Sequence, residues 1–530
     1  MNDVVNLVEK ALNDTRPIIR IVAGELAEIT RQAERAILGL PIYQRDKFLV
    51  RPVVEEVSAA DDCTTKITLL ARLEPTYLRL ILSEAVRWER YDRRKKAWVQ
   101  TDPPKEIALG ILARFGDWQF STVTGVLTTP TLRPDGTILS EPGYDPATRL
   151  YLADPPAMPD IAKHPTRDDA LAALALLYAL LVEFPFTDKP SRSVALSALI
   201  TAVARGGFMA APLHASRSPE AGSGKSYLMD TVSAIAIGRA CPVLAAGRNE
   251  EETEKRLGAV LLAGQPLICI DNVNGELGGD ALCQAVERPI VQIRILGLSE
   301  CLTIEPRSTL FLATGNNLTL SGDLTRRAIT ATLDPHMEQP ETRTFERNPV
   351  KEVLADRGRY VAAALTICRA YTVAGRPGAL PQLASFEGWS DTVRSALTWL
   401  DCADPVETLN AARAQDPRRA ELREVLTAWS AAVGTGPGGA KTATQLIKLA
   451  ESRESSTSGD YADGYSTDWA HPELREALLT VAGHNARIPS RAFGNWLRAN
   501  KGKIADSLRL TNTADQHGHA ARWWLEPISR

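Results

Sequence analysis

The chain has 530 residues, more than the roughly 250–300 at which a single hydrophobic core stops growing, so we expect several domains. Hydrophobic residues make up 44% and charged residues 24% of it, a globular composition that excludes a wholly disordered or fibrous protein. The 61 basic and 64 acidic residues give a net charge of −3, so any binding of nucleic acid must use a local basic surface.

Five parts are predicted in chain order. Residues 1–155 are an α+β domain, with a helix over Arg20–Leu38 and a strand over Lys47–Val54. Residues 156–207 are a Pro-rich linker and a helical connector, whose most apolar stretch, Ala170–Phe184, is shorter than the ~20 residues of a membrane span. Without a membrane segment, and with cysteines too scattered for a disulfide framework, the chain is expected in the cytoplasm.

The pattern then changes. Over residues 208–345 short apolar strands alternate with amphipathic helices, which predicts an α/β core and makes the whole chain a multidomain α/β protein. Residues 346–412 are a helical subdomain that begins with one long helix over Pro349–Ala374. Residues 413–530 form a separate C-terminal domain, which contains a glycine-rich break at 434–439 and a polar loop over Glu451–Gly464.

The strongest functional signal is the sequence SPEAGSGKS, which ends at Ser226 and opens a helix. A strand, a glycine-rich turn and a helix make a P-loop, in which small residues let backbone N–H groups approach a phosphate chain. Lys225 would bridge the β- and γ-phosphates of ATP, and the Ser226 hydroxyl would bind Mg²⁺. Pro219 replaces the first glycine of the usual pattern. The nucleotide is expected to contact Pro219, Glu220, Ala221, Gly222, Ser223, Gly224, Lys225, Ser226 and Tyr227.

A second signal is an apolar strand, Pro266–Asp271, that ends in an acid. Open α/β sheets bind ligands at the carboxyl ends of their strands, so Asp271 is predicted to hold Mg²⁺ through water. The next residue, Asn272, cannot accept a proton from an attacking water molecule. Three acids stay open for that role: Asp271 itself, Glu276 and Glu220.

A third apolar strand, Ser308–Asn317, ends in two amides. The amide of Asn316 can contact the γ-phosphate and orient water without adding charge. Arg326 and Arg327 follow soon after. Beside the preceding motifs, one of these arginines is predicted to reach the phosphates bound by a neighbouring subunit and to stabilise the charge that develops during phosphoryl transfer.

Two further segments are predicted to bind DNA. Val291–Ile304 alternates around a glycine, which indicates a β-hairpin with Arg294 as a phosphate contact. Near the C-terminus a winged helix is predicted, from helical patterns at Pro472–Ala482 and Pro489–Asn500 and short strands at Leu508–Thr511 and Ala521–Leu525. Residues 481–530 hold eight basic and three acidic residues, a net charge of +5 that suits phosphate contacts. The expected contacts there are Arg491, Arg498, Lys501 and Lys503.

In this order the motifs resemble the superfamily 3 helicases within the AAA+ ATPases, and more closely the ATPases of phages, plasmids and integrated elements. The segments that carry the resemblance are Pro219–Tyr227, Glu252–Leu257, Ile270–Gly279, Arg294–Glu300, Ala313–Leu318 and Gly322–Arg327. Residues 1–155 resemble the region that precedes phage- and poxvirus-type helicase cores. The resemblance implies a superfamily 3-like AAA+ core that assembles into a hexameric ring, hydrolyses ATP and translocates on DNA.

By the same resemblance, Lys225 and Ser226 contact phosphate and Mg²⁺, Asp271 contacts Mg²⁺, and Asn316 senses the γ-phosphate. The predicted function is an ATP-dependent DNA helicase or translocase in the replication of a mobile genetic element. ATP and Mg²⁺ are its cofactors, and single-stranded or forked DNA and further copies of the chain are its partners. A separate primase could be another, because no paired-acid or zinc-ribbon pattern precedes the core.

Two alternatives remain open at this point. One is a nucleotide-dependent initiator or helicase loader that binds DNA without unwinding it, an interpretation to which Asn272 lends weight. The other is a P-loop phosphotransferase that acts on a small molecule and needs no arginine from a second subunit.

Overall fold

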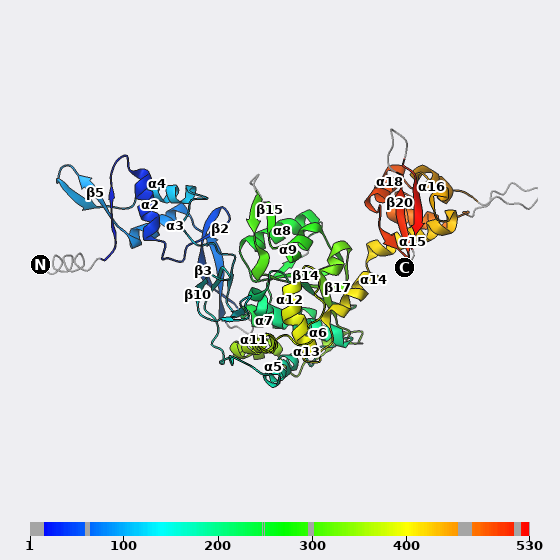
Figure 1. The fold of residues 1–530 in the computed structure, drawn as a ribbon, viewed down its shortest axis with the longest axis horizontal. Helices are drawn as coiled ribbons and strands as arrows, with labels where there is room; N and C mark the ends of the chain where they lie inside the picture. Colours follow the sequence, from blue (N-terminus) through cyan, green and yellow to red (C-terminus); the bar gives the residue numbers. More distant parts are fainter. Residues whose placement is uncertain are drawn as a thin grey trace, which may run out of the picture. The chain divides into compact units, whose positions relative to one another are not determined.

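The computed structural model describes residues 15–58, 64–245, 247, 250–294, 301–453, 469–513 and 521–528. Contacts divide the chain into two compact units (Figure 1). In the part of the chain that is described, no helix is both long and apolar enough to cross a bilayer. The first unit is Met1–Gly275, Gly279–Leu318 and Arg327–Thr408, and the second is Glu276–Gly278, Thr319–Arg326 and Leu409–Arg530.

The first unit begins with a three-stranded sheet covered on one face by three helices. β1 runs parallel to β5, and β5 runs antiparallel to β6. Ile19 and Trp88 point from this sheet into a core shared with the helices. The elements are β1 (Ile18–Ile21), α2 (Leu26–Ala36), α3 (Pro75–Ala85), β5 (Arg87–Asp92), β6 (Ala97–Gln100) and α4 (Lys105–Ala113).

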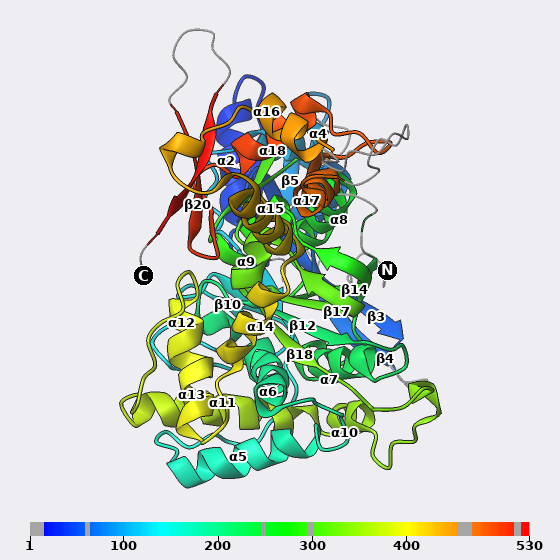
Figure 2. The same cartoon turned by 90° about the vertical axis from the view of Figure 1, so that its right-hand side faces the viewer.

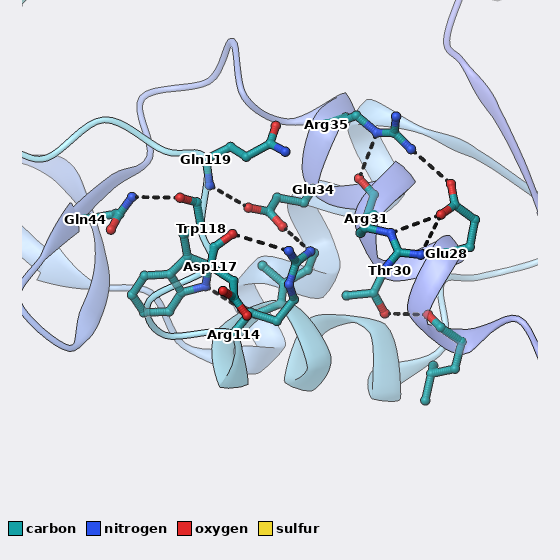
Figure 3. Close-up of polar contacts among 12 residues, drawn as sticks. Glu28, Thr30, Arg31, Glu34, Arg35, Gln44, Arg114, Asp117, Trp118 and Gln119 are labelled. Atoms are coloured by element: carbon teal, nitrogen blue, oxygen red, sulfur yellow. Dashed lines mark hydrogen bonds and ion pairs between the residues drawn. The ribbon is translucent and has the colours of Figure 1, made fainter.

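A buried carboxylate holds the helices of this sheet together (Figure 3). Glu34 on α2 is only 1% exposed. It accepts hydrogen bonds from Arg114 Nη1 at 2.7 Å and from the backbone N–H of Gln119 at 2.9 Å. The indole N–H of Trp118 donates to the carbonyl oxygen of Ile111 at 2.6 Å. These bonds fix the end of α4 and the chain after it against α2, because a buried charge must keep its partners.

Sequence analysis placed the first helix too early. Ile18–Ile21 forms β1, and α2 begins only at Leu26, after Gly24 has turned the chain with a φ of 89°. The prediction of a helix from Arg20 is therefore wrong at its start, because alternation of exposed and buried side chains wins over the helical spacing. The strand predicted at Lys47–Val54 is confirmed as part of β3 (Phe48–Ser58).

Small sheets connect this region to the core. β3 pairs antiparallel with both β2 and β4, and β11 pairs with β10 and β7. Their side chains fill two small hydrophobic clusters rather than one large core. The elements are β2 (Tyr43–Arg45), β4 (Thr64–Arg72), β7 (Gly125–Leu127), β8 (Thr131–Leu132), β9 (Ile138–Leu139), β10 (Gly143–Asp145) and β11 (Leu150–Leu152).

The predicted α/β core is confirmed as a parallel sheet of five strands, in the order β13-β14-β17-β12-β18 (Figure 2). Parallel strands need crossover connections, which here contain helices. α6 contacts α7, and both contact β12. The elements are α5 (Arg167–Ala179), α6 (Lys189–Ala204), β12 (Leu213–Ser218), α7 (Lys225–Ile237), β13 (Val243–Ala245), α8 (Glu250–Leu262), β14 (Leu267–Leu277), α9 (Asp280–Glu287), β17 (Leu310–Leu320) and β18 (Ala328–Thr332).

The hairpin predicted between the acidic and amide strands is confirmed. β15 (Val291–Arg294) pairs antiparallel with β16 (Cys301–Ile304), and the connection between them lies outside the described residues. The single long helix predicted at Pro349–Ala374 is two helices, α10 (Pro349–Ala355) and α11 (Arg357–Val373). The helix breaks at Asp356, whose φ of −147° and ψ of 61° are not helical.

The second unit packs four helices and a three-stranded antiparallel sheet around one core, with Trp429, Phe493 and Leu525 fully buried in it. The helices predicted at Pro472–Ala482 and Pro489–Asn500 are confirmed as α17 (Pro472–Ala482) and α18 (Ser490–Ala499). The predicted polar loop Glu451–Gly464 falls almost wholly outside the described residues. The other elements are α15 (Pro417–Val433), α16 (Ala443–Ala450), β19 (Ile504–Ala505), β20 (Leu508–Asn512) and β21 (Trp523–Pro527).

Candidate functional site

A glycine-rich loop, residues 219–224, joins the end of β12 to the start of α7. Gly222 and Gly224 have φ values of 73° and 95°, in the left-handed region that favours glycine. A Cβ added at Gly222 would lie 2.8 Å from the backbone nitrogen of Glu341, too close for any side chain. Because α7 begins at Lys225, its first N–H groups lack partners within the helix and make this end favourable for an anion.

Lys225 is buried beside this loop, with 8% of its surface exposed. Its ammonium group donates to the carbonyl oxygen of Glu220 at 2.8 Å and to Ser223 Oγ at 3.0 Å. Burial lowers the pKa of Lys225, while the carboxylates of Asp271 and Glu220 act in the opposite direction. A cation so placed, with neutral oxygens as its direct partners, is poised to bind a phosphate.

Asp271 lies in the neighbouring strand, β14, and is held by a threonine of β17. Thr314 Oγ1 donates to Asp271 Oδ1 and accepts the backbone N–H of Asn272 at 3.2 Å. Asn272 has a φ of 53°, a left-handed conformation that asparagine tolerates better than most residues. The threonine therefore fixes the carboxylate that was predicted to hold Mg²⁺. The left-handed backbone at position 272 explains why an asparagine is suited to it.

The two amides within β17, Asn316 and Asn317, have different neighbours. Asn316 stands opposite Ser218 in the parallel ladder, beside the entry to the glycine-rich loop. The Asn317 side chain donates to the carbonyl oxygen of Pro219 at 3.5 Å. Asn316 thus lines the cavity beside the loop, and Asn317 contacts the loop itself.

These residues share the wall of one cavity of about 600 Å³, within the usual range for small-molecule sites. The structure brings together most of the residues predicted to bind nucleotide and Mg²⁺. It adds a segment after β18 that sequence analysis missed. The lining residues are Ala221, Gly222, Ser223, Gly224, Lys225, Ser226, Tyr227, Asp271, Asn272, Thr314, Gly315, Asn316, Pro340, Glu341, Arg343 and Phe345.

The missed segment brings an arginine and an aromatic ring. Arg343 donates to the carbonyl oxygen of Glu183 through Nη2, and its guanidinium lies 4.9 Å from the centroid of the Phe345 ring. Its buried Nη1 has no hydrogen-bond partner among the described residues. Phe345 also packs on Tyr227, with ring centroids 5.5 Å apart. The cavity wall therefore carries a guanidinium beside an aromatic ring, which suits a phosphorylated ligand that carries a flat base.

The other predicted acids and arginines lie elsewhere. The backbone carbonyl oxygen of Glu220 accepts a hydrogen bond from Lys225, and the Glu220 side chain is exposed. Glu276 belongs to the second unit. Arg326, also in the second unit, pairs with Asp323 at 2.6 Å and keeps 42% of its side chain exposed. Arg327 belongs to the first unit, where it is 5% exposed and forms an ion pair with Glu287.

The predicted DNA contacts are partly visible. The backbone of Arg294 pairs with Cys301 in the hairpin, while its side chain lies outside the described part. The four C-terminal candidates are exposed, one in the first turn of α18, one in its last turn and two in the residues that follow the helix. Arg498 donates to Asn495, and Lys503 Nζ donates to Asn500 Oδ1 at 2.9 Å. All four, Arg491, Arg498, Lys501 and Lys503, belong to the second unit.

No protein-family model and no curated protein matches the chain. Among solved structures it is similar to apo structures of the C-terminal region of NrS-1. Two of these are of an A form, each 12% identical, with TM-scores of 0.33 and 0.32. The match covers 71% of this chain and 76% of the first, and 85% of this chain and 99% of the second. A third is 10% identical with a TM-score of 0.35, and the match covers 93% of this chain and 98% of that one.

Proposed function

We propose that this protein is an ATP-dependent DNA helicase or translocase that acts in the replication of a mobile genetic element. The observation that carries the proposal is the cavity in which Lys225, Asp271 and Asn316 meet at the start of α7. The residues present fit ATP and Mg²⁺. Gly222, where a side chain would meet the backbone of Glu341, the guanidinium of Arg343 in the cavity wall and a helix N-terminus all favour a phosphate chain.

Within this cavity each group has a distinct part. The ammonium of Lys225 binds the β- and γ-phosphate oxygens, and the amide of Asn316 contacts the γ-phosphate. Phe345 and Tyr227 form the wall on which the adenine base stacks. The hydroxyl of Ser226 and the carboxylate of Asp271, oriented by Thr314, hold Mg²⁺, which neutralises phosphate charge when it is bound.

The proposal also assigns the acid that polarises the attacking water. Among the described residues that line the cavity, the acids are Asp271 and Glu341. Asp271 is engaged by Thr314 and assigned to Mg²⁺, so we assign Glu341 to the water. Sequence analysis did not consider Glu341, because it lies beyond β18 and outside any strand end.

The action on DNA rests on the second unit and on self-association into a ring. Helices α16 to α18 followed by an antiparallel sheet have the order of a winged helix, and exposed basic residues lie on and after α18. Of the two arginines predicted to act across a subunit boundary, Arg327 is buried in an ion pair, so the proposal assigns that contact to Arg326.

The test is ATP hydrolysis by the full chain with and without single-stranded DNA. Lys225→Ala should lower the rate by at least ~100-fold, since it removes a preorganised cation from the transferred phosphate. Lys163→Ala, which removes an exposed lysine distant in sequence, is the control and should hydrolyse ATP at the normal rate. Equal rates for wild type and Lys225→Ala would refute the catalytic assignment.

One observation favours a second function, a nucleotide-dependent initiator or helicase loader. Position 272 carries an exposed amide in a left-handed conformation, where a hydrolysing ATPase of this kind usually places a carboxylate. A forked DNA substrate separates the two functions. Strand displacement that requires ATP supports the helicase, whereas ATP turnover without displacement supports the loader.

A further inference from the structure

The three-stranded sheet β1-β5-β6 has a second face, opposite the one that packs on the helices. Because side chains alternate along a strand, Ile19 and Trp88 enter the core while Arg20 and Tyr91 point away from it. Tyr91 stands directly opposite Trp98 of β6, with ring centroids 5.5 Å apart. The guanidinium of Arg20 lies 4.8 Å from the centroid of the Trp98 ring. This outward face, defined by these three residues, leaves Tyr91 47% exposed.

A basic turn borders the outward face. It joins β5 to β6, and its four side chains are all exposed: Arg93, Arg94, Lys95 and Lys96. Asp92 Oδ1 accepts the backbone N–H groups of Arg94 at 2.7 Å and of Lys95 at 3.2 Å, and these hydrogen bonds lower the pKa of Asp92. The carboxylate therefore shapes the turn, and the basic side chains project from a defined backbone.

The local charge is strongly positive in a chain that is net negative. Residues 87–96 hold six basic and two acidic residues, a net charge of +4 against −3 for the whole chain. Both acids are occupied. Glu89 is 5% exposed and pairs with Arg20 at 3.3 Å and with Arg87 at 2.9 Å, and Asp92 serves the turn. The face thus offers aromatic rings beside cations whose local acids are neutralised, the combination that binds the bases and phosphates of a single strand.

We infer that the outward face and the basic turn bind single-stranded DNA, with bases stacked on Tyr91 and Trp98 and phosphates contacted by the turn. A single strand fits better than a duplex, because stacking on a side chain requires an unpaired base. This contact goes beyond the proposed function, which assigns DNA to the C-terminal unit. It also needs no ATP hydrolysis, so its failure and the failure of the ATPase are separate results.

The direct experiment is photocrosslinking of the full chain to an oligothymidine that carries 5-iododeoxyuridine. The proposal expects a crosslinked peptide from residues 87–100, with the adduct on Tyr91 or Trp98. The same oligonucleotide made double-stranded should lose this crosslink. Crosslinks confined to other segments would overturn the proposal. An unlabelled RNA of the same sequence that competes for this crosslink better than the unlabelled DNA would also overturn it.

Charge and stacking are separated by fluorescence anisotropy with a labelled oligothymidine over a range of salt concentrations. Arg93→Ala/Arg94→Ala should reduce the magnitude of the negative slope of log K against log[salt] by about 1.4, since each single-strand phosphate contact contributes about 0.7. The control Lys163→Ala/Arg359→Ala removes the same charge from two exposed sites elsewhere and should keep the wild-type slope. A slope shared by both double variants would refute the phosphate contacts.

Tyr91→Ala should weaken binding at least fivefold, because it removes a stacking ring, and Tyr91→Phe should restore wild-type affinity. Circular dichroism establishes that the variants are folded, which the exposure of Tyr91 leads us to expect. If Tyr91→Ala binds as tightly as wild type, or Tyr91→Phe as weakly as Tyr91→Ala, stacking at this position is excluded.

Discussion

The cavity beside Lys225 and the outward face of the N-terminal sheet use similar side chains in opposite surroundings. In the cavity, Arg343 and Phe345 lie beside the buried ammonium of Lys225. On the sheet, Arg20 and Trp98 lie beside a turn whose cations are fully in water. A buried cation has weak solvation to lose when an anion binds, so one residue can carry most of an affinity. Exposed cations are well solvated and screened, so they act through their number and through salt dependence.

The largest predicted effect would be an exception to this contrast, because a single exposed arginine would control the rate of ATP hydrolysis. Arg326 is exposed, yet as a donor to a neighbouring copy its replacement by alanine should lower the rate of ATP hydrolysis by ~10³-fold or more. The reason is that the ring would bury a side chain that is exposed in one copy. Hydrolysis by Arg326→Ala, measured at concentrations where the chain self-associates, checks this expectation.

Mixing two inactive variants gives a sharper version. A ring that contains both Arg326→Ala and Lys225→Ala protomers has some sites with an intact lysine and an intact arginine from the neighbour, so activity should return. Arg327→Ala is the control. It removes the buried guanidinium that pairs with Glu287, which also accepts a hydrogen bond from Ser385 Oγ at 2.8 Å, so it should lower the free energy of unfolding and should not be rescued by mixing. Failure of the mixture to recover activity would exclude an arginine shared between subunits.

Glu341 comes next in size. Glu341→Gln keeps the shape of the side chain and removes its ability to accept a proton, so hydrolysis should fall by about 10²-fold while ATP binding is retained. Isothermal titration with a non-hydrolysable analogue measures the binding affinity, and a steady-state assay measures the rate of hydrolysis. Glu220→Gln is the matched control on an exposed acid of the glycine-rich loop, and an effect there instead of at Glu341 would move the role to Glu220.

Parts of this site followed from the sequence because simple rules apply to them. Strand ends of a parallel sheet meet at one edge, so Asp271 and Asn316 could be placed beside the glycine-rich loop. Thr314 was hidden because a buried threonine inside an apolar strand gives no signal of its hydrogen bond. Glu341, Arg343 and Phe345 could not be found, since only tertiary packing brings that irregular segment to the cavity.

The fold shows the same division. Patterns with a clear period gave the five-stranded core, the hairpin at Val291–Ile304 and the helices of the second unit. The errors lie where two local preferences compete. Ile18–Ile21 alternates as a strand inside a longer helical spacing, and Asp356 interrupts an otherwise continuous helical pattern by adopting a non-helical backbone.

The smallest of the predicted effects tests the aromatic half of the comparison. Phe345 contacts Tyr227 and the guanidinium of Arg343, so Phe345→Ala removes an aromatic ring from the wall of the cavity. A base–ring stack is worth about 1–3 kcal/mol, so ATP affinity should fall about tenfold, and Phe345→Tyr should restore it. Titration with ATP and with inorganic triphosphate separates the base from the phosphates. An equal loss for both ligands would show that Phe345 acts by positioning Arg343, the arginine proposed to favour the phosphate chain, and would move the base away from this wall.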